Sequence, residues 1–268
     1  MDGPVDIPVA LTIAGSDSGG GAGIQADLKS FHQFGAFGTS VVTAVTAQNT
    51  RGVTAIHPIP LDLVRAQLRA LADDLPPAAA KTGMLATSAL VEVVADEMAM
   101  LDCPLVVDPV MVATSGDRLL DDGAERALLE RLIPRATLVT PNLGEAERLT
   151  GAPVRTPEEM GVAARRLVEL GADAALVKGG HLSGDVVDVL FDGQRETTWA
   201  RVRIESRHTH GTGCTLSAVV TAGLAHGQSL SDSVDRALAF VAEAIATAPG
   251  LGSGHGPLNH FARHDGAS

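Results

Sequence analysis

The sequence predicts an α/β fold in which helices cover both faces of a mostly parallel central sheet. Short apolar runs at 105–109, 138–142 and 174–180 each end in a polar or glycine-rich segment. Helical patterns at 123–132 and 157–170 separate these runs. Parallel strands need crossover helices and are buried on both faces, so this alternation favours a doubly covered parallel sheet. Ligands bind beyond the carboxyl ends of strands in such sheets, so the polar segments mark the expected site.

The remaining elements follow from apolar spacing and turn signals along the chain. Apolar runs predict strands at 9–14 and 41–45, and residues at helical spacing predict helices at 22–34, 61–71 and 89–101. Two further runs, 186–190 and 197–204, lie on either side of Asp192-Gly193 and predict an antiparallel hairpin at one sheet edge. We find no linker and no internal repeat. We therefore expect a single domain over 1–268, with an ordered core at about 8–248 and a tail, 249–268, that is either loose or folded over the site.

Composition narrows the classes of protein that the chain can represent. Its 268 residues are 45% hydrophobic and 19% charged, which suits a large packed core. A net charge of −12 argues against a nucleic-acid or anionic-membrane binder, because such proteins present a basic face. The two cysteines do not suggest a disulfide scaffold. With no signal peptide and no apolar run near the ~20 residues of a membrane span, we expect a soluble, cytoplasmic protein.

The segment Thr209–Cys214 combines a glycine turn with the start of an apolar helix. Gly211 and Gly213 allow a sharp turn and close approach of the backbone to a ligand. Unpaired amides and the helix dipole make such a helix start suitable for binding an anion, and they would favour the thiolate of Cys214. The same residues also fit a tight turn followed by a buried, inert cysteine. This segment alone leaves both interpretations open.

Several other polar positions admit two interpretations. The glycines of 15–23 exceed what a strand-to-helix turn needs, which favours close approach to a ligand over a plain turn. Asn142 and Glu145 fit a helix capping box, and in isolation we prefer that to a role beside Mg²⁺. Lys178 follows a strand and fits either a solvated strand end or a phosphate ligand. Gln48 fits either the end of a strand or a group that reads a planar ring.

Histidines near Cys214 suggest two further kinds of site. His208, His210 and Cys214 could be taken for zinc ligands, but only three ligands are local and the glycines move Cys214 away from the histidines. A Cys214–His210 pair could serve a cysteine hydrolase, although the intervening glycines do not ensure contact between the two side chains.

Taken together, the motifs of the chain resemble one family over about residues 10–260. Their order and spacing are similar to those of the hydroxymethylpyrimidine/phosphomethylpyrimidine kinases of thiamine biosynthesis, which have the ribokinase-like three-layer fold. The motifs that carry the resemblance are Ala14-Gly15-Ser16-Asp17, the segment 20–27, Thr46-Ala47-Gln48-Asn49-Thr50, Lys81-Thr82-Gly83-Met84-Leu85, Asp108-Pro109-Val110-Met111, Pro141-Asn142-Leu143-Gly144-Glu145, Lys178-Gly179-Gly180 and Thr209-His210-Gly211-Thr212-Gly213-Cys214.

The resemblance implies a role for each matching position. Gln48 would hydrogen-bond the aminopyrimidine ring, and the rest of the substrate pocket would be formed by Gly15, Asp27, Met84 and Val110. ATP phosphates and Mg²⁺ would be held by Asp108, Asn142, Glu145 and Lys178, with Asp108 and Glu145 reaching the metal mainly through water and phosphate. The anion hole would be Gly211, Thr212 and Gly213, and Cys214 would replace the aspartate base of related sugar kinases. Gly19 and His208 depart from the residues usual in the family, at positions without an implied role in chemistry.

The expected activity is MgATP-dependent phosphorylation of 4-amino-5-hydroxymethyl-2-methylpyrimidine and then of its monophosphate. The resemblance also suggests a homodimer and leaves a monovalent-cation requirement open. Three alternatives remain at this stage: a pyridoxal kinase of the same superfamily, the Cys214–His210 hydrolase, and a pyrimidine-binding protein without catalysis. The intact Lys178, Glu145 and Cys214 argue against the last.

Overall fold

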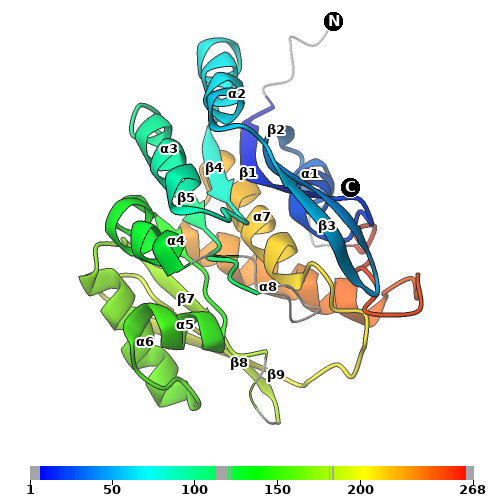
Figure 1. Cartoon of the computed structure of the whole chain (residues 1–268). Helices are drawn as coiled ribbons and strands as arrows, with labels where there is room; N and C mark the ends of the chain where they lie inside the picture. Colours follow the sequence, from blue (N-terminus) through cyan, green and yellow to red (C-terminus); the bar gives the residue numbers. More distant parts are fainter. Residues whose placement is uncertain (1–6, 113–119, 121, 181, 183, 264–268) are drawn as a thin grey trace, which may run out of the picture.

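A single nine-stranded sheet forms the centre of the protein, within the residues described by the computed structural model: 7–112, 120, 122–180, 182 and 184–263. The strand order is β3-β2-β1-β4-β5-β6-β7-β8-β9 (Figure 1). The strands are β1 (Val9–Asp17), β2 (Phe37–Asn49), β3 (Gly52–Pro58), β4 (Ala79–Thr82), β5 (Leu105–Val107), β6 (Leu138–Val139), β7 (Ala175–Lys178), β8 (Val186–Phe191) and β9 (Glu196–Arg201). Neighbours from β2 through β7 are parallel, which confirms the predicted fold class.

Antiparallel hairpins close both edges of the sheet. The predicted hairpin is β8–β9, which pairs onto β7 at one edge. A second hairpin, β2–β3, forms the opposite edge and was not anticipated from the sequence. Strand β2 runs to Asn49, beyond the predicted end at residue 45, and thereby carries Gln48 out to the turn of the hairpin.

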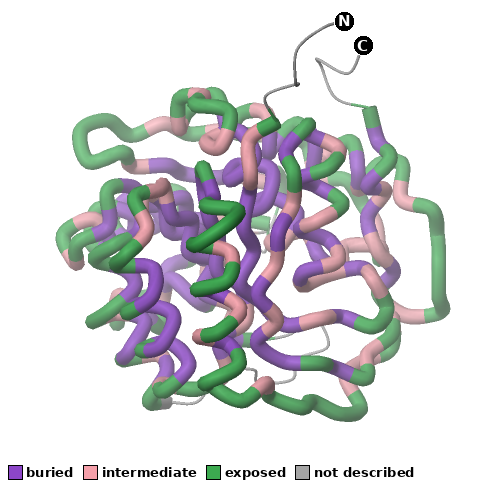
Figure 2. Tube along the Cα trace, turned by 90° about the horizontal axis from the view of Figure 1, so that it is seen from above, coloured by how far each residue is buried: buried purple, intermediate pink, exposed green. Residues whose placement is uncertain are grey.

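Helices cover both faces of the sheet and define two cores. One face carries α1 (Gly23–Gln33), α7 (Thr212–Ala225) and α8 (Leu230–Ala246), and the other carries α2 (Leu61–Asp74), α3 (Ser88–Met98), α4 (Asp122–Ala127), α5 (Leu143–Thr150) and α6 (Pro157–Glu169). Successive strand residues point to opposite faces: Leu105 and Val107 join one core and Val106 the other. The buried residues of both cores run through the interior in Figure 2.

The helix boundaries show where the sequence patterns were incomplete. The predicted helix at 123–132 is α4 followed by one π-helical turn, Leu128–Leu132, and a short 3-10 turn, Ile133–Arg135. Helix α3 ends at Met98, three residues before the predicted end. Helix α8 was not anticipated, although its apolar residues lie at helical spacing. None of the helices in the described ranges is long and apolar enough to cross a membrane.

The tail is folded onto the body of the protein as far as residue 263. The Asn259 N–H donates to the carbonyl of Ala244 at 3.0 Å, and Leu258 and Ala262 are buried in the core with α8. The His210 N–H donates to the Gly256 carbonyl at 3.2 Å. Within the described residues, the tail therefore packs against helix α8 and the segment that carries His210. Residues 264–268 lie outside the described residues.

Candidate active site

A cavity of about 830 Å³ lies where the carboxyl ends of the central parallel strands meet the start of α7. Residues that follow β1, β4, β5, β6 and β7 line it, as expected for the ligand site of a parallel sheet. All but one of the side chains and glycines chosen from the sequence contribute to its wall. They are Gly15, Gln48, Met84, Asp108, Val110, Asn142, Glu145, Lys178, Gly211, Thr212, Gly213 and Cys214.

Lys178 joins two acidic groups at the floor of the cavity. Its Nζ lies 3.0 Å from Oδ1 of Asp108, and both side chains are largely buried. Burial by itself would lower the Lys178 pKa, but the charges of Asp108 and Glu145 outweigh it and hold this pKa above its usual range. Burial raises the pKa of Glu145 to about 7; Lys178 opposes this rise, and the negative charge of Asp108 adds to it. The ammonium group of Lys178 thus interacts electrostatically with two neighbouring carboxyl groups.

Glu145 also has the structural role foreseen from the sequence. Asn142 accepts from the Glu145 N–H at 3.0 Å, and Glu145 accepts from the Asn142 N–H at 2.8 Å. This reciprocal capping box starts α5 and is confirmed. The second carboxylate oxygen of Glu145 lies 3.4 Å from the Met111 N–H, which aims the side chain into the cavity wall.

The donor set around Asp108 and Glu145 fits Mg²⁺. Two carboxyl groups, those of Asp108 and Glu145, lie beside a single lysine. No group of three or more His, Cys, Asp or Glu side chains suited to a metal gathers within the described ranges. Mg²⁺ keeps several waters and is held by one or two carboxylates together with substrate phosphates, so this pair meets its needs.

The start of α7 is a backbone turn that requires glycine. Gly211 has φ of +87°, and a Cβ built on it would lie 1.8 Å from the Gly21 carbonyl oxygen. A Cβ on Gly213 would lie 3.1 Å from the Lys178 Nζ. The hydrogen bond from the Thr215 N–H to the Gly211 carbonyl, 2.8 Å, begins the helix. The amides of Gly213 and Cys214 come before the Thr215 amide in the chain and belong to the first turn of α7. The positive end of the helix dipole therefore lies at the cavity.

Cys214 does not have the low pKa expected at a helix start. Burial raises the pKa of its thiol to about 11; nearby Lys81 opposes this rise, whereas Asp27 and Asp108 add to it. We expected the amide dipoles at the helix start to lower this pKa, but the removal of the sulfur from water has the larger effect. At neutral pH the group is a thiol.

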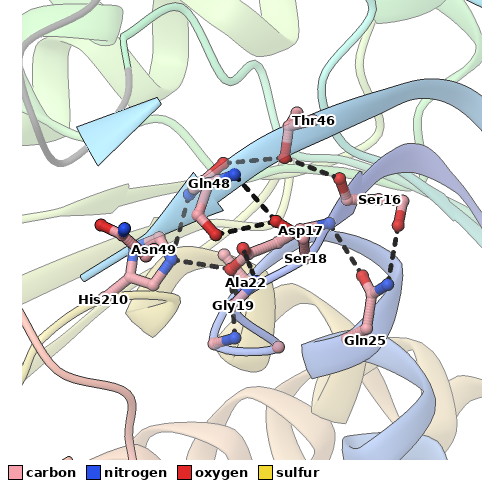
Figure 3. A network of polar contacts seen from close by, with 12 residues as sticks. Ser16, Asp17, Ser18, Gly19, Ala22, Gln25, Thr46, Gln48, Asn49 and His210 are labelled. Atoms are coloured by element: carbon pink, nitrogen blue, oxygen red, sulfur yellow. Dashed lines mark hydrogen bonds and ion pairs between the residues drawn. The ribbon is translucent and has the colours of Figure 1, made fainter. Parts of the chain in front are cut away.

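A polar network connects the glycine segment after β1 with the strand that carries Gln48 (Figure 3). The Asp17 carboxylate accepts from the amides of Gly19 at 2.7 Å and Ala22 at 2.8 Å, and from Nε2 of His210 at 2.9 Å. Burial alone would raise the Asp17 pKa, but these hydrogen bonds outweigh it and the pKa is lowered. Nε2 of His210 also lies 3.2 Å from the amide of Gln48.

Comparison with known proteins places this site in a family. A family model described as phosphomethylpyrimidine kinase matches residues 17–259. The hydroxymethylpyrimidine/phosphomethylpyrimidine kinase of Streptomyces coelicolor is 50% identical over 257 residues, 96% of each chain. This chain belongs to the phosphomethylpyrimidine kinase family. The family member of the same description from Bacillus subtilis is 48% identical over 258 residues, 94% of each chain.

Solved structures agree with this assignment to the ribokinase-like fold. An ADP complex of Bacillus subtilis pyridoxal kinase matches with a TM-score of 0.89 and 39% identity, covering 96% of this chain and 98% of that one. Staphylococcus aureus pyridoxal kinase in complex with AMP-PCP and pyridoxal has a TM-score of 0.87 and 35% identity, covering 96% and 94%. The chain is therefore a kinase.

Asp27 does not take the place expected for this phosphomethylpyrimidine kinase family member. It was predicted to line the substrate pocket, but its side chain is fully buried and is absent from the cavity wall. It pairs with Nζ of the equally buried Lys81 at 2.7 Å and accepts from the Thr12 hydroxyl at 2.6 Å. The two opposite charges have no access to water and pair with each other, and both act on the pKa of the Cys214 thiol.

Sequence reasoning missed several groups that line the cavity. Asp17 and His210 are separated by 193 residues, so no local pattern could pair them. Arg148, Asp188, Arg201 and Arg203 line another part of the wall, and the apolar side chains there include Leu238, Val241 and Ile245 of α8. The available signals for Asp17 were its place in a glycine-rich segment and in the family motif Ala14-Gly15-Ser16-Asp17. The Cys214–His210 hydrolase is not supported, because Nε2 of His210 contacts Asp17 and Gln48 and the sulfur of Cys214 accepts from the Gly23 N–H.

Proposed function

We propose that this kinase phosphorylates 4-amino-5-hydroxymethyl-2-methylpyrimidine with ATP, and then phosphorylates the monophosphate to the diphosphate. The observation that carries the proposal is one cavity that unites Gln48, Lys178 and the amides at the start of α7. The hydroxymethylpyrimidine/phosphomethylpyrimidine kinases of Streptomyces coelicolor and Bacillus subtilis share about half of this sequence over nearly its full length, which supports the same two substrates.

The reaction needs the hydroxymethyl oxygen to bond to the γ-phosphorus while the bond to the bridging oxygen of ADP breaks. The amides of Gly213 and Cys214 face the charge that develops on the transferred group, and Lys178 supplies a positive charge 3.1 Å from where a Gly213 side chain would begin. Asp108 and Glu145 would hold Mg²⁺, which would supply further neutralisation of the phosphate charge. Because phosphoryl transfer passes through a loose transition state, positioning and charge carry most of the catalysis.

Cys214 has a limited part in this scheme. A group with a pKa of about 11 is a protonated thiol at neutral pH and cannot take up a second proton, so Cys214 does not act as the base in that state. We therefore place Cys214 only as a contact to the reacting hydroxyl. The hydroxymethyl proton is lost late, as the new P–O bond forms, and passes to an oxygen of the transferred phosphoryl group.

Product identification tests the proposal. The purified chain is incubated with MgATP and the hydroxymethylpyrimidine, and the products are followed by mass spectrometry. We expect the monophosphate first and the diphosphate later, each with one equivalent of ADP. A reaction that stops at the monophosphate would contradict the second step, and no ATP-dependent product would contradict both.

Pyridoxal kinase is the second candidate, because the two solved structures above are pyridoxal kinases at 35–39% identity. The higher identity to the pyrimidine kinases, 48–50%, favours the pyrimidine. A competition assay with equal concentrations of both alcohols decides, and we expect phosphopyrimidine as the main product. The homodimer and the cytoplasmic location stay predictions, and the monovalent-cation requirement stays open. Light scattering tests the homodimer, and assays in K⁺ or Na⁺ test the cation requirement.

A further inference from the structure

His210 meets Gln48 and Asp17 through the same ring nitrogen. Nε2 lies 2.9 Å from Oδ2 of Asp17 and 3.2 Å from the side-chain amide of Gln48 (Figure 3). An ionised carboxylate can only accept hydrogen bonds, and Asp17 is 3% exposed and already accepts from three backbone amides. Nε2 of His210 must therefore carry the hydrogen. Towards Gln48, the same nitrogen offers no lone pair and only a share of that single hydrogen in a bifurcated contact.

Thr46 restricts the orientation of the Gln48 amide in the same way, from the other side. Its hydroxyl lies 2.9 Å from the Ser16 carbonyl and 3.3 Å from the Gln48 amide. A carbonyl oxygen only accepts, so the single hydroxyl hydrogen is used on Ser16. The lone pairs of Thr46 Oγ1 then remain for Gln48, and they need an N–H. His210 and Thr46 thus require, independently of one another, that the amide oxygen faces the histidine and the NH₂ faces the threonine.

We infer that His210, held as a donor by Asp17, is a positioning residue that fixes the amide orientation of Gln48 and so determines which ring the site accepts. In Figure 3 the amide has its nitrogen towards His210 and its oxygen towards Thr46, which leaves both contacts without a usable hydrogen. A half-turn about the last side-chain bond lets the amide NH₂ donate to Thr46 and lets the amide oxygen share the Nε2 hydrogen of His210 with Asp17. Amide nitrogen and oxygen are nearly equal in size, so the partners determine the orientation.

The orientation has a consequence for the ligand, which rests on the proposed function. After His210 and Thr46 are satisfied, the amide retains one oxygen lone pair and one N–H. An exocyclic amino group next to a ring nitrogen pairs with these two, with the amino group on the oxygen side, nearer His210. In the proposed substrate the hydroxymethyl carbon is attached beside the amino-bearing carbon. This orientation therefore directs the alcohol towards Gly211, which follows His210 in the chain.

The test compares two ligands that differ only in the amino group. Calorimetry without ATP gives the Kd of 4-amino-5-hydroxymethyl-2-methylpyrimidine and of its analogue without the 4-amino group. We expect His210→Leu to reduce the preference for the amino compound about ten-fold, the scale of one hydrogen bond. His210→Gln, whose NH₂ lies at the same position along the side chain as Nε2, restores part of it. His226→Leu, a histidine outside the cavity wall, is the matched control.

Melting temperatures show whether the variants fold. Should His210→Leu fail to fold, Thr46→Val provides the same comparison from the other side of the amide. Equal losses of affinity for both ligands would overturn the inference, because a merely structural role would weaken both alike. If the wild-type chain binds neither pyrimidine, the proposed function fails, and this inference fails with it.

Nitrogen NMR provides a readout independent of substrate. In protein labelled with ¹⁵N at histidine, we expect the shift of a protonated Nε2 for His210 and a change in Asp17→Asn, whose amide can donate to that nitrogen. An unprotonated Nε2 in the wild-type chain would overturn the inference even if the pyrimidine binds.

Discussion

Nζ of Lys178 lies 3.0 Å from Oδ1 of Asp108, so the lysine at the end of β7 neutralises the aspartate that follows β5. The pair is enclosed at the carboxyl edge of the sheet, where Glu145 adds a second carboxyl group. Charges interact strongly where water is scarce, so one lysine sets the charge balance of this part of the cavity. Binding of ATP phosphates there would have to engage the same lysine.

Replacement of Lys178 tests its part in catalysis. We expect Lys178→Met to lower kcat by about 10²–10³, the loss typical of removing one group that stabilises transition-state charge. Steady-state kinetics with MgATP measure this. Lys29→Met is the matched control, because Lys29 lies outside the cavity wall. Equal kinetics for both variants would remove Lys178 from the reaction.

Two glycines at the start of α7 should respond differently to alanine. Gly213→Ala places a methyl group 3.1 Å from the flexible Lys178 Nζ, so we expect a folded protein with kcat at least about ten-fold lower. Gly211→Ala meets the Gly21 carbonyl and a φ of +87°, so we expect a marked fall in melting temperature. Gly180→Ala, with nothing near its added methyl, is the stability control. A Gly211→Ala variant as stable as this control would contradict the described turn.

Alkylation measures the state of Cys214. In a Cys103→Ser background we expect slow reaction with iodoacetamide at pH 7, rising about ten-fold per pH unit, because only the thiolate reacts and its pKa is about 11. Burial raises the pKa of the Cys103 thiol to about 11 as well, so its alkylation would show the same pH dependence as that of Cys214. Cys103 is therefore replaced. A rate that levels off near pH 7 would show that the helix amides stabilise the thiolate after all.

The buried pair of Asp27 and Lys81 predicts a non-additive effect on stability. We expect Lys81→Met to lower the free energy of unfolding by about 3–5 kcal/mol, because it leaves a carboxylate buried without its partner. Adding Asp27→Asn removes that charge and should recover much of the loss, while Thr12 keeps an oxygen to donate to. Urea unfolding measures both. If Asp27→Asn alone strongly raised the Kd of the substrate, the carboxylate would have a direct role in binding.

His260 should make stability depend on pH. Burial, with a smaller effect of Lys29, lowers its pKa from 6.5 to about 4, and Nε2 lies 3.0 Å from the Thr215 hydroxyl. The unfolded chain takes up the proton first as pH falls. Neutral His260 therefore contributes fully to the free energy of unfolding above pH 6.5. As the pH falls from about 6.5 to 4, this contribution of up to ~3 kcal/mol is lost. We expect His260→Gln to flatten the pH dependence of urea unfolding, and an unchanged slope would contradict this.

Patterns within short stretches predicted much of the site. Asn142 and Glu145 are three residues apart, and Gly211 and Gly213 directly precede a helix, so local rules sufficed for the capping box and the turn. The β2–β3 hairpin was missed because the outward face of β3 is largely exposed and carries no apolar alternation. Asp27 was misplaced because a resemblance transfers a position without showing what lies between it and the ligand.

The sequence by itself determined the alternation of strands and helices in the parallel part of the sheet, the glycine turn before Cys214 and the family, since these depend on neighbours along the chain. Only the tertiary structure decided that Cys214 is a thiol, that Asp27 belongs to Lys81, and that Asp17 meets His210 across 193 residues. Loss of water around a group and the partner that replaces it depend on distance in space, and folding sets that distance.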